Sequence, residues 1–112
     1  MDKSVLEHRA NLFKAIADPV RLQILEFLRD GEKCVCEIIP FIGRSQSTIS
    51  KNLDMLYRAG ILERREDGRR TLYKIKSQKV LELLKLADSL VVDLLSTYAK
   101  TVEYLESQKS SQ

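Results

Sequence analysis

The 112-residue sequence is poor in the features on which most enzymes and membrane proteins depend. It has one histidine, no glycine-rich phosphate loop and no carboxylate pair at a clear catalytic spacing, which argues against an enzyme. No apolar run approaches the roughly 20 residues that a membrane-spanning helix needs. The first residues, Met1, Asp2 and Lys3, lack the hydrophobic core of a signal peptide. We therefore expect a cytoplasmic protein with no membrane partner.

Cysteine is also scarce, because the chain has only Cys34 and Cys36. Two cysteines separated by one residue are poor disulfide partners within a chain, and a cytosolic protein is expected to keep them reduced. A position at the start of a helix favours thiolates, which bind soft metals and are readily oxidised. We expect this pair to be reduced and reactive.

The size and composition of the chain predict one domain. With 44% hydrophobic residues it can bury a modest core, and oligomerisation is an easy source of further stability. We expect a mainly helical α+β domain over residues 1–106. The polar residues 107–112, without hydrophobic periodicity, are expected to form a disordered tail.

The most informative stretch is residues 44–76, which begins with a helix that we call the reader helix (residues 45–60). Its apolar residues recur at i, i+4, i+7 and i+8, and its opposite side is short and polar. Ser45 is a natural N-cap, and Gly60 ends the helix. The apolar stripe consists of Ile49, Leu53, Leu56 and Tyr57, and the polar side of Ser47, Ser50, Lys51, Asp54 and Arg58.

A hairpin with a basic tip follows the reader helix. The segments 61–62 and 72–75 are expected to form two strands, since Asp67-Gly68 is a strong hairpin signal that places Arg69 and Arg70 at the tip. Residues 44–76 hold nine Lys and Arg against four Asp and Glu, whereas the rest of the chain has a net charge of −2. A concentrated basic region of this kind supplies affinity for phosphates, although charged hairpins can also simply keep an edge strand soluble.

Three helical segments precede the reader helix. The first covers about residues 5–17, and the second starts at Asp18-Pro19 and ends by Gly31, with Leu22, Leu25, Phe27 and Leu28 in its core. The third, residues 34–42, is expected to be short or kinked because of Pro40. The short turn at residues 43–44 predicts a helix-turn-helix.

The last predicted helix, residues 80–105, has a long apolar stripe. The stripe is wider than a short hairpin could cover, so we expect the same helix of a second subunit to cover it in a homodimer. The alternative is that this helix packs only on its own core.

The motifs together resemble the ArsR/SmtB family of winged helix-turn-helix repressors. The resemblance is carried by DPVRL at residues 18–22, CVCEI at 34–38, SQSTISKNLDML at 45–56 and the AGIL and DGRR segments of the hairpin. It implies a homodimer with a two-stranded wing and a long C-terminal dimerisation helix, which represses transcription by binding double-stranded operator DNA. It also implies major-groove contacts by Gln46, Ser47, Thr48, Ser50 and Lys51, whose side chains suit base edges and phosphates. Arg69 and Arg70 would contact phosphates or the minor groove.

The resemblance extends to Cys34 and Cys36, because arsenic-sensing and cadmium-sensing members of the family carry a similar CVC box. Such a site would bind As(III), Sb(III) or Cd(II), and no resident cofactor is required. The chain departs from the known sensors, however. Ile39 stands where arsenic sensors have a third cysteine, the N-terminal segment has no cysteine, and the last helix lacks the histidine that zinc sensors use.

Several interpretations therefore stay open for the cysteine pair. It could sense a soft metal or metalloid, act as a thiol-redox switch, or have no sensing role. His8 is a candidate further ligand across the dimer, although a histidine near a terminus is most often only solvated. A winged-helix module that binds proteins instead of DNA is the alternative for the whole chain, but it would more often present apolar anchors on the reader helix.

Overall fold

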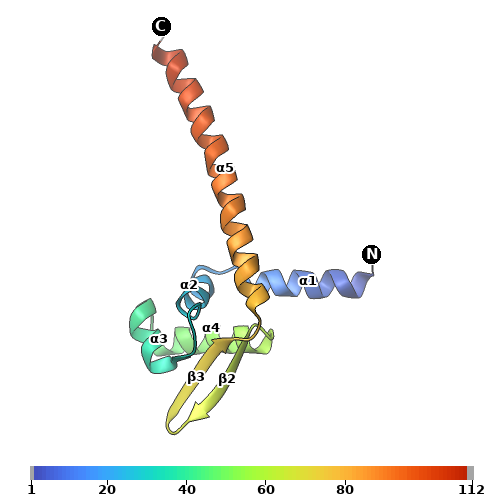
Figure 1. Ribbon diagram of the computed structural model, residues 1–112, viewed down its shortest axis with the longest axis vertical. Helices are drawn as coiled ribbons and strands as arrows, with labels where there is room; N and C mark the ends of the chain where they lie inside the picture. Colours follow the sequence, from blue (N-terminus) through green and yellow to red (C-terminus); the bar gives the residue numbers. More distant parts are fainter. Residues whose placement is uncertain (1, 111–112) are drawn as a thin grey trace. The chain divides into compact units, whose positions relative to one another are not determined.

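The computed structural model describes residues 2–110, and its backbone contacts divide the chain into two compact units, residues 1–78 and 79–112. The described residues of the second unit all belong to helix α5 (Gln78–Ser110). Within residues 2–110, none of the helices combines the length and the apolar character that a membrane-spanning segment requires. The first unit contains α1 (Lys3–Ile16), α2 (Pro19–Phe27), β1 (Lys33–Cys34), α3 (Val35–Ile42), α4 (Gln46–Arg58), β2 (Leu62–Asp67) and β3 (Arg70–Ile75) (Figure 1).

Helix α2 starts where the sequence predicts. The Asp18 carboxylate accepts hydrogen bonds from the backbone N–H groups of Val20 (2.9 Å) and Arg21 (3.1 Å), and Pro19 occupies the first turn, where no intrahelical donor is needed. The helix ends at Phe27, earlier than the segment expected to reach Gly31.

The buried face of α2 differs in part from the expected one. Ile24, Leu25 and Leu28 are buried, whereas Leu22 is 40% exposed. The reason is helical spacing, since Ile24, Leu25 and Leu28 lie at i, i+1 and i+4 on one face and Leu22 lies off that stripe. Phe27 is half-buried and stacks on Phe41 of α3, with the ring centres 4.0 Å apart.

Helix α3 spans only eight residues, in agreement with the short helix expected from Pro40, which lies inside it. Gly43 ends it in the left-handed region, with φ of 76°, and its N–H donates to the Ile39 carbonyl at 3.0 Å. The two residues Arg44 and Ser45 then lead into α4, which completes the helix-turn-helix.

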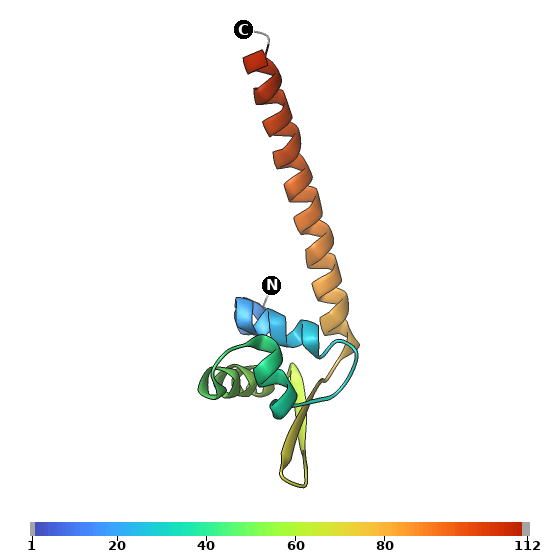
Figure 2. The same ribbon diagram turned by 90° about the vertical axis from the view of Figure 1, so that its left-hand side faces the viewer.

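The sheet is antiparallel with the strand order β1-β3-β2, and its β2-β3 hairpin projects away from the helices of the first unit (Figure 2). Pairing of β2 with β3 runs from Leu62 opposite Ile75 to Asp67 opposite Arg70. Strand β2 is therefore longer than the expected 61–62 segment, because cross-strand pairing continues through exposed charged residues. The third strand, β1, was not expected from the sequence. It adds Cys34 opposite Leu72 of β3.

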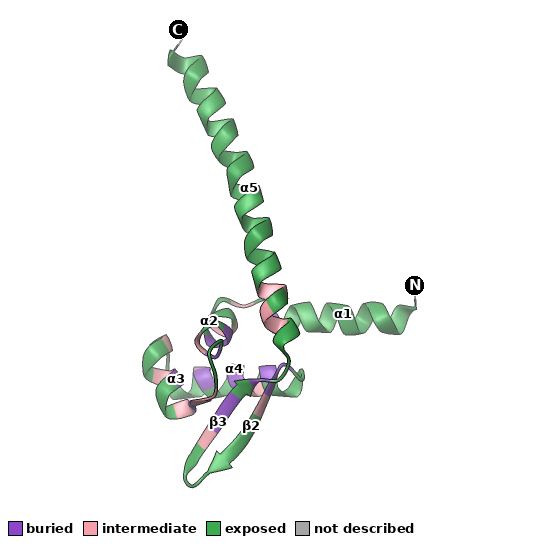
Figure 3. Ribbon diagram, in the orientation of Figure 1, coloured by how far each residue is buried: buried purple, intermediate pink, exposed green. Residues whose placement is uncertain are grey.

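The core of the first unit lies where the inner faces of the helices meet the base of the hairpin (Figure 3). The apolar stripe expected on α4 is confirmed for Ile49, Leu53 and Leu56, which are completely buried, whereas Tyr57 is 37% exposed. The other buried hydrophobic residues are Ile16, Ile24, Leu25, Leu28, Cys34, Ile38, Ile61, Leu62, Leu72, Tyr73 and Ile75.

Helix α5 is the one long helix that the C-terminal stripe predicts. It continues through Ser110, so residues 107–110 of the expected disordered tail are helical, and residues 111–112 lie outside the described part of the chain. No residue of α5 is buried within the described chain; apolar residues in its first turns are half-buried, and most of its large apolar side chains from Leu86 onward are exposed (Figure 3). The exposed ones are Leu86, Leu90, Val91, Val92, Leu94, Leu95, Tyr98, Val102, Tyr104 and Leu105.

Candidate nucleic-acid interface

Helix α4 begins in a cluster of hydroxyl groups. The Ser45 Oγ accepts a hydrogen bond from the backbone N–H of Thr48 at 3.2 Å, as the N-cap prediction requires. The same hydroxyl lies 2.9 Å from the Thr48 Oγ1 and 3.2 Å from the Ser47 Oγ. Thr48 is half-buried and turned toward this cap, whereas Ser47 is exposed. The cap therefore orients both hydroxyls at the start of the helix.

The C-terminal end of α4 is also capped by backbone hydrogen bonds. Gly60 has φ of 79°, the Ile61 N–H donates to the Leu56 carbonyl at 3.0 Å, and the Gly60 N–H donates to the Tyr57 carbonyl at 3.0 Å. This pair of bonds is the Schellman motif, in which a left-handed glycine lets the chain turn sharply. Because Ile61 and Leu56 are both buried, the wing starts from a fixed position.

The exposed face of α4 and the wing tip surround one hollow, with a cavity volume of about 350 Å³. Gln46 and Ser50 line it from α4, and Arg69 and Arg70 line it from the tip of the wing. The structure thus brings together four of the residues that we expected to contact DNA, although the α4 pair and the wing-tip pair are separated in the chain by the 18 residues from 51 to 68. The other three expected contacts, Ser47, Thr48 and Lys51, lie on α4 but do not line this hollow. The lining also includes Cys34, Val35, Cys36, Thr71 and Tyr73.

The tip of the wing is a two-residue turn at Gly68 and Arg69. Gly68 has φ of 63° whereas Arg69 does not have a positive φ, which is the pattern of a type II′ hairpin turn. Arg70 pairs with Asp67 across the turn at 3.0 Å, and both arginines are exposed, as expected. The turn therefore presents two cations next to the polar face of α4.

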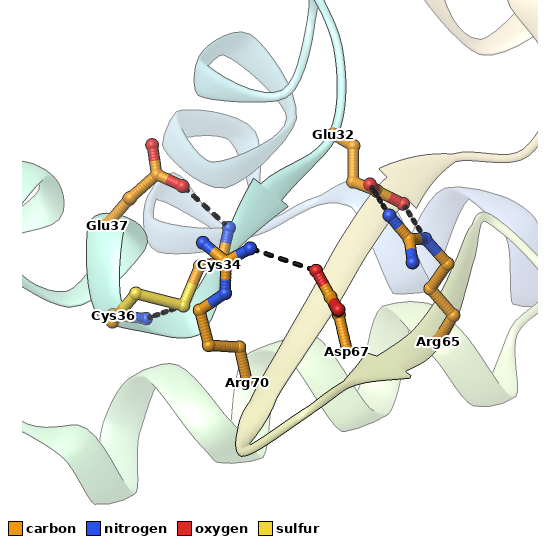
Figure 4. A network of polar contacts seen from close by, with 7 residues as sticks. All are labelled: Glu32, Cys34, Cys36, Glu37, Arg65, Asp67 and Arg70. Atoms are coloured by element: carbon orange, nitrogen blue, oxygen red, sulfur yellow. Dashed lines mark hydrogen bonds and ion pairs between the residues drawn. A yellow bond between two sulfur atoms is a disulfide. The ribbon is translucent and has the colours of Figure 1, made fainter.

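Ion pairs that the sequence did not reveal hold the wing in place. The Arg65 guanidinium donates to both oxygens of Glu32 at 3.0 and 2.8 Å, joining β2 to the loop before β1 (Figure 4). This hydrogen bonding lowers the pKa of the Glu32 carboxyl below its usual value. Arg64 lies over the Tyr57 ring of α4, 3.9 Å from its centre. The wing is thus tied to two other elements by the side chains of β2.

A polar network fixes α4 from its buried side. Arg21 of α2 donates to the carbonyls of Ala15 (2.7 Å) and Lys14 (3.2 Å) at the end of α1, and to the Asn52 Oδ1 at 3.0 Å. Asn52, the buried polar residue of α4, in turn donates to the Thr48 carbonyl at 2.8 Å. One guanidinium therefore joins three helices. Arg21 belongs to the DPVRL segment, but its partner lies 31 positions away and no local pattern predicts the pairing.

The two cysteines also line this hollow, and their state differs from the expected one. Cys34 and Cys36 form a disulfide, with the Cα atoms 5.0 Å apart, instead of two free thiols (Figure 4). Extended backbone at Cys34 and helical backbone at Cys36 bring the two side chains to one side, which the small sequence separation did not suggest. Cys34 is also the N-cap of α3, because its sulfur accepts the Cys36 N–H at 2.9 Å and its own N–H donates to Glu37 at 3.1 Å.

The structure does not assemble a metal site around these sulfurs. Within residues 2–110 no group of three or more His, Cys, Asp or Glu side chains could hold a metal ion. His8, on the exposed surface of α1, is accordingly not brought to the pair within this chain. A sulfur engaged in a disulfide also lacks the thiolate that soft metals bind. The residues present, in this form, do not fit a metal centre.

Comparison with known proteins identifies the class of protein to which this geometry belongs. The family model of bacterial regulatory proteins of the arsR family matches residues 18–64. An uncharacterized HTH-type transcriptional regulator of Methanocaldococcus jannaschii is 44% identical over 85 residues, which cover 75% of this chain and 96% of that protein. A Streptomyces lividans protein named "Probable mercury resistance operon repressor" is 36% identical over 84 residues, covering 75% and 67% of the two chains.

A solved structure shows the same architecture. The homodimeric winged helix-turn-helix DNA-binding domain Mb0332 of Mycobacterium bovis has a TM-score of 0.75 and 35% identity, covering 82% of this chain and 85% of that one. The winged helix-turn-helix that the sequence predicts is thereby confirmed, and the family is one of transcriptional regulators, not of enzymes. The chain belongs to the arsR family of bacterial regulatory proteins.

Proposed function

We propose that this protein is a homodimeric, sequence-specific repressor that binds double-stranded operator DNA. The observation that carries the proposal is the shared hollow, which places the polar face of α4 beside the two cations of the wing tip. A recognition helix in the major groove with an arginine-bearing wing beside it needs this arrangement. Two such units in a symmetric dimer would contact two half-sites.

The residues divide into base-reading and backbone-contacting groups by their chemistry. Gln46 suits the edge of adenine, whereas the hydroxyls of Ser47, Thr48 and Ser50 suit bases or phosphates. Lys51 suits guanine or the backbone. The wing-tip pair, Arg69 and Arg70, suits phosphates or a narrow minor groove.

The second subunit is argued from α5. Its exposed apolar side chains form a patch that a soluble chain seldom leaves in water, and an identical helix offers the same surface in return. The homodimeric state of the Mycobacterium bovis domain supports this choice.

Two effectors are candidates for releasing the DNA. The first is a soft metal or metalloid, As(III), Sb(III) or Cd(II), at Cys34 and Cys36, supported by thiolate chemistry and by the relative named for mercury resistance. It needs a reduced pair and a ligand from outside residues 2–110 of this chain. The second is thiol oxidation, which the Cys34–Cys36 disulfide favours. Either would act through coupling of typically about 1 to 3 kcal/mol between the two sites.

Binding of a protein instead of DNA is the competing function, and the dependence of binding affinity on salt concentration distinguishes the two. Binding to DNA releases counterions and must weaken steeply as salt rises, whereas an apolar protein interface must respond weakly. The exposed face of α4 carries Gln46, Ser47, Ser50 and Lys51, which are polar, whereas a protein-binding face would need apolar anchors. This composition supports DNA as the partner.

The test is a fluorescence-anisotropy titration of the chain on the DNA upstream of its own gene. Gln46→Ala should weaken binding to that DNA about tenfold or more, the loss of one bidentate base contact, while leaving binding to unrelated DNA unchanged. The exposed Lys100→Gln of α5 is the control outside the first unit. Release by cadmium or arsenite from the reduced protein, or by a mild oxidant alone, identifies the effector, and Cys34→Ser/Cys36→Ser must abolish it. Equal affinity for all DNA at all salt concentrations would reject the proposal.

A further inference from the structure

The two cysteines of the disulfide differ in their exposure to solvent. Cys34 is only 2% exposed, whereas Cys36 belongs to an exposed position on the first turn of α3. Both line the hollow between α4 and the wing tip. Because exchange of a disulfide requires an incoming thiolate to reach one sulfur, the Cys36 Sγ is the accessible target.

The leaving sulfur has a donor already in place. The backbone N–H of Cys36 donates to the Cys34 Sγ at 2.9 Å, so negative charge that develops on this sulfur is met by a hydrogen bond at the start of α3. Attack at Cys36 therefore releases the sulfur that the structure can best stabilise.

The charge of the hollow selects the incoming molecule. Arg69 and Arg70 line it, and the carboxylate in contact with Arg70 is Asp67 at 3.0 Å, which neutralises one of the two cations in part. A cavity of about 350 Å³ is large enough for a small organic thiol, and carboxylates on that thiol would face the two guanidinium groups.

We propose that the hollow is a modification site at which small carboxylate-bearing thiols form a mixed disulfide with Cys36. In this step the thiolate sulfur bonds to the Cys36 Sγ, the Cys34–Cys36 bond breaks, and its electron pair leaves with Cys34, which takes a proton from water. The reverse reaction, attack by Cys34, restores the disulfide and releases the thiol. No other oxidant or reductant is consumed.

The adduct has a consequence that rests on the proposed repressor function. It occupies the hollow that Gln46 and Ser50 share with the wing-tip arginines, so it places a bulky anion where a DNA phosphate would approach. Modified protein should therefore bind the operator more weakly than unmodified protein.

The experiment replaces one cysteine at a time with serine, so that only one thiol is left to react. Cys34→Ser keeps a good N-cap and leaves Cys36 as the only thiol, and Cys36→Ser is its matched partner. Each is incubated with glutathione disulfide, whose attack by the remaining thiolate yields the mixed disulfide and one glutathione, and the adduct is followed by intact-mass spectrometry. The thiol of Cys36 should react on the order of tenfold faster than that of Cys34, since access limits exchange. Equal rates, or a faster Cys34, would overturn the assignment.

The charge preference is tested in the Cys34→Ser background with glutathione disulfide and the cationic cystamine. Adding Arg69→Gln and Arg70→Gln should lower the ratio of the two rates about fivefold, the factor given by an attraction of about 1 kcal/mol between unit charges in water. Lys3→Gln with Arg9→Gln, an equal charge change on α1, should leave the ratio unchanged. An unchanged ratio in the wing-tip variant would overturn the choice of an anionic thiol.

The effect on DNA is measured last, by anisotropy of the purified Cys36 adduct against unmodified Cys34→Ser protein. Weaker binding that a reductant restores supports the proposal, and equal binding overturns its regulatory part. If the unmodified protein does not bind operator DNA at all, the repressor function fails, while the rates at Cys36 still decide the chemistry of the site.

Discussion

Removing the guanidinium of Arg21 should destabilise the first unit far more than removing a comparable surface arginine. In Arg21→Met the aliphatic stem is kept, but the hydrogen bonds to Ala15, Lys14 and Asn52 are lost. The carbonyls at the end of α1 can bind water instead, whereas the Asn52 Oδ1 belongs to a residue that is only 8% exposed. An unsatisfied buried acceptor costs about 1 to 3 kcal/mol, and each bond from a charged donor contributes about 1.5 to 3 kcal/mol. We expect a loss of about 3 kcal/mol in the free energy of unfolding.

Urea titrations of the wild type, Arg21→Met, Asn52→Ala and the double variant give this loss and the coupling between the two side chains. The coupling should be at least about 1 kcal/mol, since the residues are in direct contact. Arg29→Met is the control, because Arg29 pairs with Glu26 at 2.7 Å but both side chains are largely in solvent, and its cost should stay below about 1 kcal/mol. If Arg21→Met costs no more than this control, or if the cycle shows no coupling, the role assigned to the network is wrong.

Three further variants test the wing and the dimer. Arg69→Ala/Arg70→Ala should reduce the slope of log affinity for DNA against log salt by about 2, since each neutralised phosphate contributes about 0.9. Glu32→Gln should make the free energy of unfolding less dependent on pH in acid. The hydrogen bond from Arg65 lowers the pKa of Glu32 in the folded state, so the stability that the carboxylate contributes is complete above the ordinary pKa of 4.5 and is lost as the pH falls from there through the lowered pKa. Urea midpoints at several pH values measure this effect. Leu94→Glu on the exposed stripe of α5 should shift sedimentation from dimer to monomer.

Each of these variants has a contrary outcome. An unchanged salt slope would mean that the wing-tip arginines do not contact phosphates. Equal acid sensitivity of Glu32→Gln and the wild type would show that the ion pair with Arg65 does not persist in solution. A Leu94→Glu protein that sediments as the wild type does would exclude this part of α5 from the subunit contact.

The reader helix was predictable because its signals are local. Ser45 caps the start of the helix and Gly60 ends it through contacts with residues close in the chain. The spacing of Ile49, Leu53 and Leu56 indicates which side of the helix is buried. Helix α5 was predictable for the same reason, since its stripe repeats over many turns.

The parts that the sequence did not reveal depend on partners distant in the chain. Strand β1 has two residues, too few for any pattern, and exists because β3 pairs with it. The outer part of β2 is charged on both faces, so burial gives no signal there. The contact of Arg21 with Asn52 is equally non-local. The state of Cys34 and Cys36 was wrongly expected because sequence separation alone says little about where two side chains point.

The place of Cys34 in the fold also bears on which chain-length changes the domain tolerates. It is the last residue of β1 and the N-cap of α3, so no linker separates strand from helix. An insertion at this junction would have to break either the pairing with β3 or the start of the helix-turn-helix. The Gly68–Arg69 turn only connects the ends of β2 and β3, so an insertion there would leave the pairing of the two strands intact. Variation in length among related domains should therefore accumulate at the wing tip, where it alters reach along DNA while the reader helix keeps its position.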